Sequence, residues 1–392
     1  MIQSIHIKNF KNFKDTKIEG FTKLNIITGE NNVGKSNLLE ALYCLVGKDM
    51  HPCANITEIY DNIRKEPLTT DSANLIFYGL DTSKKIQITT TLDNQTLDLQ
   101  IELVSNENQR VIESQITPTT EYAQAFSQLN FALKKNNKEI YKDNLNIAKI
   151  PNFPLIPNQP SYNRQFPNFN PNQLRELSSF QRATIITPSD VARKQNAMNP
   201  NTIQAVRKIC DNNQQEESLN KSLSQFNKNI QSISFSANNQ LKLKVRNIEK
   251  EKAPLSIFGD GFIKYLHIMS ALIVNNAKVI CVDEVENGLH FSTMRLLLEH
   301  VVDFLKKDGE EDEKHNNLQV FMTTHSQEFV EILDQVIKEK DFAYETKLFC
   351  LKNKNENSQD IVSQTYYGEA LSTYFINEVN LFGGSDKYKE KP

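Results

Sequence analysis

Apolar and polar residues alternate at the start of the chain, and the pattern then changes to one typical of a helix. The run "IQSIHIKNF" (2–10) alternates as a half-buried strand does, and "KLNIITG" (23–29) is a short apolar strand. "SNLLEALYCLVG" (36–47) follows with helical spacing and a closing glycine. Residues 23–47 are therefore predicted to form a strand, a glycine-containing loop and a helix.

Shorter β-rich runs dominate residues 73–117. Polar turns separate "NLIFYGL", "KKIQITTTL", "LDLQIELV" and "RVIESQIT", which together predict an antiparallel lobe. Residues 121–149 are predicted to be helical. Six of the 13 prolines then fall between Pro151 and Pro171, a density that excludes helix and central strand and predicts an extended or disordered segment.

Strands alternate with helices in the second half of the chain. "RATIITP" (182–188), "KVICVDE" (278–284) and "LQVFMTTHS" (318–326) read as buried strands, and helical runs follow the last two. This alternation predicts a mainly parallel sheet with helices on its faces. Residues 201–232 are compatible with helix but carry no sustained heptads, which excludes a long coiled coil, and "NQLKLKVRNIEKE" predicts a strand or hairpin.

Composition narrows the class of protein. The 392 residues are 39% hydrophobic and 24% charged, which predicts a soluble globular chain with one large domain or two smaller ones. A formal charge of −3 excludes a strongly basic footprint for the whole protein, so contact with DNA would need a local patch or a partner. Scattered cysteines, no apolar run of 18 residues and no signal-peptide core predict a cytoplasmic protein without a membrane partner.

The first motif with a chemical meaning is "GENNVGKSN", which fits the G-x-x-x-x-G-K-[ST] pattern of a phosphate-binding loop. In such a loop the backbone N–H groups and the helix N-terminus wrap a polyphosphate. Lys35 would reach the β and γ phosphates of ATP, and Ser36 would hold Mg²⁺. The predicted nucleotide-binding residues are Gly29, Glu30, Asn31, Asn32, Val33, Gly34, Lys35, Ser36 and Asn37.

Two later strands end in residues suited to hydrolysis. "VICVDEVENGLH" is an apolar strand ending in two carboxylates, the form of a Walker B element, although acidic residues also end many ordinary strands. Asp283 would help to hold Mg²⁺, and Glu284 would act as general base toward the attacking water. His325 follows a strand expected beside the phosphate-loop strand, where it could contact the γ-phosphate or the water, and Ser326 could simply cap the next helix.

A second glycine-bearing turn opens a helix in "PLSIFGDGFIKYLHIMSALI" (254–273). Gly259, Asp260 and Gly261 precede apolar residues at helical spacing. A helix N-terminus with glycines is a potential anion site, and the plainer interpretation is an ordinary turn before a core helix.

With these elements in order, the chain resembles the RecF/OLD/SMC branch of ABC-type ATPases. The resemblance rests on "IHIKNFKNF", "GENNVGKSNLLEAL", "SIFGDGFIKYL", "VDEVENGLH" and "TTHS". It implies an α/β P-loop NTPase fold: an ABC-ATPase-like head with a mainly parallel sheet, an antiparallel β lobe and a helical, proline-rich insertion. The expected organisation is a head formed by 1–50 and 176–392, a β lobe at 51–120, a helical segment and Pro/Asn-rich linker at 121–175, and a short helical insertion at 200–235.

In that branch two heads enclose two ATP molecules. By resemblance, Gly259, Asp260 and Gly261 would contact the γ-phosphate in trans, and residues 286–290 would lie at the dimer seam. The chain departs from the family because Ser256 is displaced from the glycine pair of the usual signature, and the lobe-switching glutamine cannot be placed. No clustered acidic pattern follows His325, so the Toprim nuclease of OLD-type proteins is not expected.

The leading hypothesis is an Mg²⁺-dependent ATPase that works as a homodimer or higher homo-oligomer in antiphage defence or DNA repair. It would control a separate, nuclease-type effector and could contact DNA. The alternatives are a non-hydrolytic scaffold held together by ATP, a RecF-like loader at DNA gaps, and a transporter subunit, which would require a membrane partner.

Overall fold

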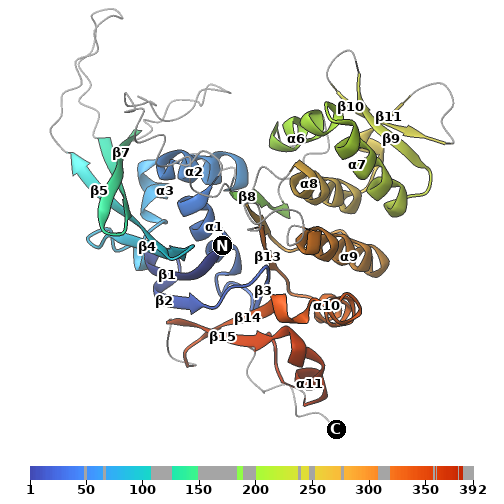
Figure 1. The fold of residues 1–392 in the computed structure, drawn as a ribbon. Coiled ribbons are helices and arrows are strands. Elements are labelled where there is room, and N and C mark those ends of the chain that lie inside the picture. Colours follow the sequence, from blue (N-terminus) through green and yellow to red (C-terminus); the bar gives the residue numbers. More distant parts are fainter. Residues whose placement is uncertain are drawn as a thin grey trace, which may run out of the picture.

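A computed structural model describes the protein, and Figure 1 shows it as a ribbon. The structure describes residues 1–47, 51–64, 68–106, 126–148, 183–188, 200–236, 240–246, 252–274, 278–307, 318–355, 358, 360–377 and 379–382. The predicted strand at 110–117 and the proline-rich stretch at 151–171 lie outside these residues.

A six-stranded sheet in the order β15-β14-β3-β13-β12-β8 forms the centre of the molecule. Neighbours from β14 to β8 pair in parallel, and β15 pairs antiparallel with β14. The strands are β3 (Leu24–Gly29), β8 (Ala183–Ile186), β12 (Val279–Val282), β13 (Gln319–Thr323), β14 (Thr346–Asn353) and β15 (Ile361–Tyr367). The predicted mainly parallel sheet is confirmed, and β13 lies between β3 and β12.

Helices cover this sheet on both faces. Every position of β3, β12 and β13 is buried, as expected for parallel strands without a solvent face. Ile27, Cys281 and Phe321 belong to one core, with helix α1 (Lys35–Val46). Ile26, Ile280 and Met322 belong to the other, with α8 (Asp260–Val274), α9 (Phe291–Lys307) and α10 (Gln327–Glu339).

A second, fully antiparallel sheet packs on the α1 side in the order β2-β1-β4-β5-β6-β7. Its strands are β1 (Ile2–Phe10), β2 (Phe13–Glu19), β4 (Ile86–Leu92), β5 (Gln95–Asn106), β6 (Phe126–Lys135) and β7 (Lys138–Ala148). Asp93 and Asn94 turn β4 into β5 with positive φ at both residues, the geometry of a tight hairpin. The predicted antiparallel lobe therefore exists, but with other boundaries.

Three expectations for this region are wrong. Residues 126–148 form the β6–β7 hairpin rather than a helix, because Asn136 and Asn137 both take positive φ between strands whose apolar residues alternate inward. "NLIFYGL" forms no strand: Phe77 makes one bridge to Phe10, and Gly79 and Leu80 then turn the chain with positive φ. The sheet also draws β1 and β2 from the expected head, so it is not confined to 51–120.

A small lobe covers the outer part of α8, at the upper right of Figure 1. Helices α6 (Pro200–Cys210) and α7 (Asn213–Phe226) contact α8, and an antiparallel sheet in the order β11-β10-β9 follows. Its strands are β9 (Ile230–Phe235), β10 (Leu241–Val245) and β11 (Ala253–Pro254). The insertion expected at 200–235 is thus helical only to Phe226, while the strand expected within 239–251 is confirmed.

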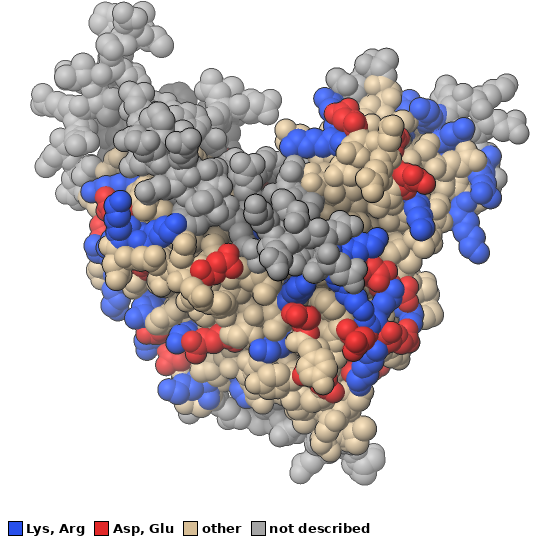
Figure 2. Space-filling model, in the orientation of Figure 1, with Lys and Arg blue, Asp and Glu red and all other residues tan. Residues whose placement is uncertain are grey.

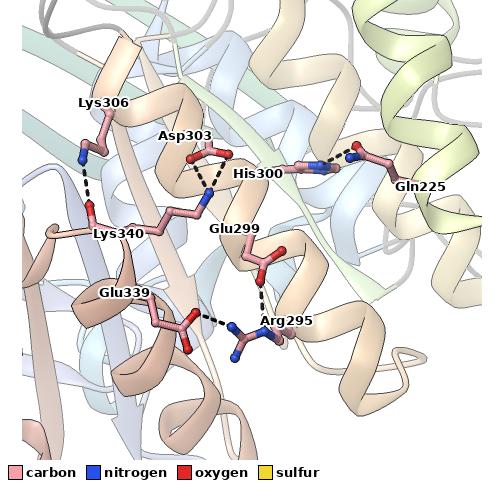
Figure 3. A network of polar contacts seen from close by, with 8 residues as sticks. All are labelled: Gln225, Arg295, Glu299, His300, Asp303, Lys306, Glu339 and Lys340. Atoms are coloured by element: carbon pink, nitrogen blue, oxygen red, sulfur yellow. Dashed lines mark hydrogen bonds and ion pairs between the residues drawn. The ribbon is translucent and has the colours of Figure 1, made fainter.

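Polar contacts join the neighbouring helices α9 and α10 (Figure 3). Arg295 bridges Glu299 of its own helix and Glu339 of α10, and the Lys340 ammonium donates to both carboxylate oxygens of Asp303, at 2.7 and 2.9 Å. In the described part of the chain, no helix is both long and apolar enough to cross a membrane.

Short elements complete the chain. They are α2 (Pro52–Glu58), η1 (Ile59–Arg64), α3 (Thr70–Asn74), η2 (Tyr78–Leu80), η3 (Leu255–Ile257), η4 (Ala343–Glu345), η5 (Gly368–Ala370) and α11 (Leu371–Ile376).

Candidate functional site

The phosphate-loop motif lies where its pattern requires, between the end of β3 and the start of α1. Gly29 and Gly34 have φ of +141° and +106°, a region that favours glycine. The Lys35 ammonium donates to the carbonyl oxygens of Gly29 and Glu30 at 2.9 and 2.7 Å, so the lysine lies across its own loop. Burial lowers the pKa of Lys35 to about 8, although Asp283 and Glu284 favour its charged form.

The β1–β2 turn packs directly on this loop. A Cβ atom on Gly34 would clash with the Asn12 amide, and Asn12 donates to the Asn32 carbonyl at 3.3 Å. The Asn37 amide in turn donates to Asn12 Oδ1 at 2.8 Å. The opening phrase of the sequence is therefore part of the same structural unit as the phosphate loop, a role for Asn12 that the sequence alone did not indicate.

A buried ion pair also involves the β1–β2 turn. Lys11 pairs with Glu40 of α1, whose other oxygen accepts from Arg64 at 2.8 Å. Burial lowers the pKa of Lys11, and Glu40 opposes the shift. The pair ties the β1–β2 turn to the helix that begins with Lys35.

Asp283 follows β12 at the carboxyl edge of the central sheet, beside the phosphate loop. It is 8% exposed, and the Thr323 hydroxyl of β13 donates to its carboxylate at 2.6 Å. Burial raises the pKa of Asp283, while hydrogen bonds from Thr323 and Ser36 lower it. The hydrogen bond between Ser36 and Asp283 brings together the two residues predicted to hold Mg²⁺.

These two oxygen donors fit Mg²⁺, which takes few protein ligands alongside substrate phosphates and water. When bound, Mg²⁺ would neutralise charge on the phosphates. It would also offset the burial that disfavours the Asp283 carboxylate.

Glu284 has an unusual backbone conformation, with φ of +46°. Such a conformation costs roughly 1–3 kcal/mol for a residue other than glycine and persists only where the surroundings hold it. Two contacts do so here: the Glu284 N–H donates to Thr323 Oγ1 at 2.7 Å, and the Lys264 ammonium donates to the Glu284 carbonyl. Asn287 also donates to Glu284 Oε2, at 3.3 Å.

The sequence alone does not single out Lys264 of α8 as a site residue, because it is one polar position in a mostly apolar helix. Its side chain has no exposed surface. Burial lowers its pKa to about 8, against the attraction of Glu286, Asp283 and Glu284. Lys264 and Lys35 thus both interact with these three carboxylates, one from α8 and the other from α1.

His325 is exposed at the end of β13, which pairs with β3 as expected. The backbone N–H of His325 donates to Glu286 Oε1 at 2.7 Å. Ser326 caps α10, because its hydroxyl oxygen accepts from the Phe329 N–H at 3.1 Å, so the simpler interpretation of Ser326 is confirmed.

The Gly259–Gly261 turn begins α8 and packs on the loop after the Walker B strand. A Cβ atom on Gly261 would clash with the Gly288 carbonyl, whereas one on Gly259 would meet nothing within 4 Å. Asp260 also lies against Gly288, 3.5 Å from Asp260 Cβ to the position a Gly288 Cβ would take. The structure therefore places this turn against residues 288–289 of its own head, with Gly259 facing open space.

Two comparisons with known proteins cover most of the chain. A family model described as "AAA domain, putative AbiEii toxin, Type IV TA system" matches residues 24–331. A protein of Helicobacter pylori (strain ATCC 700392 / 26695) named "ATP/GTP phosphatase" is 68% identical over 384 residues, 98% of this chain and 100% of that protein.

Two further matches are weaker. The "DNA replication and repair protein RecF" of Bacillus cytotoxicus is 40% identical over 58 residues, 15% of this chain and 16% of that protein. A solved SMC head bound to the C-winged helix domain of ScpA shares 9% identity at a TM-score of 0.48, over 94% of this chain and 98% of that one. The family model covers most of the sequence, including the phosphate loop and the Asp283–Glu284 pair. The chain therefore belongs to this family of AAA-domain P-loop ATPases.

Proposed function

We propose that the chain binds ATP with Mg²⁺ and hydrolyses it between two copies of the head. The observation that carries this proposal is the meeting of Lys35, Ser36 and the Asp283–Glu284 pair at one edge of the central sheet. The name of the Helicobacter pylori relative, "ATP/GTP phosphatase", supports hydrolysis of a nucleoside triphosphate.

In this mechanism each residue has one task. Residues 29–37 wrap the phosphates, with Lys35 moving from the loop carbonyls to the β and γ phosphates, and Ser36 and Asp283 hold Mg²⁺. Glu284 accepts a proton from the attacking water, and His325, in the loop after the neighbouring strand β13, orients that water or the γ-phosphate. Gly259 and Asp260 contact the γ-phosphate bound to the partner copy, while the buried Gly261 packs on Gly288 of its own head and fixes the turn.

The exposed surface beside the Gly259–Gly261 turn supports a second copy. Ile257 is 59% exposed in η3 just before the turn, and Phe291 is 53% exposed where α9 begins after residues 286–290. Both exposed apolar side chains flank the segments that we expect to meet the partner copy. A homodimer would cover them.

ATP turnover would control a separate effector of the nuclease type in antiphage defence or DNA repair. The family description, which includes a putative toxin of a toxin–antitoxin system, supports a two-component arrangement. The local similarity to RecF proteins supports a role connected with DNA.

Hydrolysis by the Glu284→Gln variant tests the mechanism. Loss of the general base should lower kcat by about 10²–10⁴-fold, while the Kd for ATP should stay within about threefold because Glu284 does not hold the nucleotide. Phosphate release with and without Mg²⁺ and equilibrium binding of ATP measure the two quantities.

The control is Glu328→Gln, which removes an exposed carboxylate from the first turn of α10. It should leave both kcat and the Kd unchanged. Absence of Mg²⁺-dependent hydrolysis in the parent protein, or full activity of Glu284→Gln, would contradict the proposal.

A further inference from the structure

The outer face of the β9–β11 sheet carries lysines and serines. Leu241 and Leu243 of β10 point into the core, so Lys242 and Lys244 alternate to the other face. Ile230, Ile233 and Ala253 are likewise buried on the neighbouring strands.

Strand register brings these polar residues side by side. Lys242 pairs with Ser234, and Lys244 pairs with Ser232. Lys252, just before β11, reaches across the sheet and donates to Ser234 Oγ at 2.8 Å. The three ammonium groups therefore share one face with two serine hydroxyls.

No carboxylate balances these lysines within the described residues. Some lysines in or beside the β2–β7 sheet are paired with carboxylates: Lys8 with Asp15, Lys17 with Glu19, and Lys85 with Glu102. The described structure contains no ion pair from Lys242, Lys244 or Lys252 to an Asp or Glu side chain. The three ammonium groups are therefore available to an anionic partner.

The whole lobe is basic in a chain that is acidic overall. Residues 200–254 contain nine Lys and Arg residues against five Asp and Glu residues, whereas the formal charge of the chain is −3. Figure 2 shows Lys and Arg gathered along the outer edge of this lobe, at the upper right. The positive charge is thus local, as contact with nucleic acid would require.

We propose that this face, defined by Lys242, Lys244, Lys252, Ser232 and Ser234, binds the phosphate backbone of duplex DNA. Lysine ammonium groups and serine hydroxyls both donate to phosphate oxygens. Two residues along a strand rise about 7 Å, a spacing at which successive lysines can reach separate phosphates of one DNA strand. Lys242 and Lys244 can therefore follow one backbone.

A single strand fits this face less well. Single-stranded nucleic acid is bound by aromatic platforms on which bases stack. The aromatic rings near this face already pack on other side chains of the protein. Arg207 lies over Phe235, at 5.1 Å from the ring centroid. Phe226 packs on Phe262 and Tyr265. The lysine and serine side chains of the face offer no apolar anchor for a lipid bilayer either.

The proposal deepens the proposed function, on which it rests for the role of DNA, but it does not require hydrolysis. The lysine face is also connected to the proposed ATP site, because β11 continues through η3 into the Gly259–Gly261 turn. Binding on this face would therefore contact the same segment that leads to the proposed trans contact.

Fluorescence anisotropy with a labelled 30-base-pair duplex, titrated from about 50 to 200 mM salt, tests the inference. The slope of log Kd plotted against log salt concentration reports how many phosphates the protein neutralises. In the triple variant Lys242→Ser, Lys244→Ser, Lys252→Ser this slope should decrease in magnitude by roughly 2–3, about one unit for each lysine removed. The Kd of this variant at 100 mM salt should rise at least tenfold.

The matched control removes three paired lysines, as Lys8→Ser, Lys17→Ser, Lys85→Ser, and should change neither the slope nor the Kd beyond twofold. Equal losses in the two triple variants, or an unchanged slope in the first, would overturn the inference. Tighter binding of the single strand, or binding to phosphatidylserine vesicles without binding to the duplex, would overturn it as well.

Basal ATP hydrolysis without DNA should be the same in all three proteins, because none of these lysines touches the nucleotide site. A parent protein that binds the duplex as described but does not hydrolyse ATP would refute the proposed function alone. A parent protein that hydrolyses ATP but does not bind the duplex would refute this inference alone.

Discussion

At the scale of single residues, Lys264 is the residue outside the phosphate-loop and Walker B motifs that we expect to affect hydrolysis most. It holds the carbonyl of Glu284, the residue with positive φ that we expect to act as base. Lys264→Met keeps the length of the side chain and removes this hydrogen bond. We expect kcat to fall by about 10–100-fold, because a small displacement of a catalytic group has a cost of this order.

A purely structural role would give another result. Removing one member of a buried charge cluster is destabilising, because Asp283, Glu284 and Glu286 lose an attracting cation and the Glu284 carbonyl loses a donor. The melting temperature of Lys264→Met should therefore fall, while its Kd for ATP, measured where the variant is folded, should stay within about threefold of the parent value. A Kd raised by as large a factor as kcat is lowered would contradict a positioning role.

We expect Lys35 to make ATP binding depend on pH. Its pKa in the free protein is about 8, lowered by burial, and the negative phosphates of ATP should raise it again. Below about pH 7 the ammonium is already charged, so binding takes up no proton there. Above pH 8 binding takes up a proton, and the Kd should rise toward about tenfold per pH unit.

Titration calorimetry at pH 7.0 and pH 8.5, each in two buffers with different ionisation enthalpies, measures this uptake. The apparent enthalpy should depend on the buffer only at pH 8.5. Lys264→Met removes the other buried lysine of the site and should retain the dependence. Equal enthalpies in both buffers at pH 8.5 would contradict the assignment to Lys35.

The site residues that sequence could predict are those within continuous motifs. Lys35, Ser36 and Asp283 follow from spacing and flanking strands, and the structure brings them together. Lys264 and Asn12 could not be predicted, because their partners are distant in sequence and only the packing of α8 and of the β1–β2 turn makes the contacts. No local pattern carries that information.

At the scale of elements, α10 offers a direct test of capping beside His325. The Ser326 hydroxyl oxygen accepts from the Phe329 N–H at the start of this helix. Ser326→Ala should lower the free energy of unfolding by about 1 kcal/mol, measured by urea denaturation. Ser224→Ala is the control, because Ser224 donates to a carbonyl within α7 and caps no helix N-terminus. Equal effects of the two substitutions would contradict the capping role.

The strands of the central sheet were predictable because they are apolar throughout and are followed by helices. The β6–β7 hairpin was not, because its alternation is interrupted by lysines and asparagines that also suit a helix surface. Asn136 and Asn137 carried the missing signal: two adjacent residues able to take positive φ indicate a two-residue hairpin turn.

At the scale of the whole molecule, the proposed dimer depends on the exposed surface around η3. Ile257→Asp places a charge in that surface and should raise the dimer Kd at least tenfold, about 1.4 kcal/mol. Sedimentation velocity with ATP and Mg²⁺ measures this in the Glu284→Gln background, where hydrolysis does not release the pair.

Ile376→Asp is the control, since Ile376 is 80% exposed on α11, outside the proposed interface. It should leave the dimer intact. Dimerisation of Ile257→Asp as strong as that of the control would show that this surface does not join the two copies.

The partners of the phosphate-loop strand have a consequence for synthesis of the chain. β3 ends at residue 29, yet it pairs with β13 and β14, which begin at residues 319 and 346. A ribosome adding 5–20 residues per second needs roughly 15–60 s to cover that interval. Throughout that time the nascent β3 lacks both of its neighbours in the central sheet. The ability to hold ATP should therefore appear only after residues 319–353 have been synthesised, so nucleotide binding would report that both neighbours of β3 are in place.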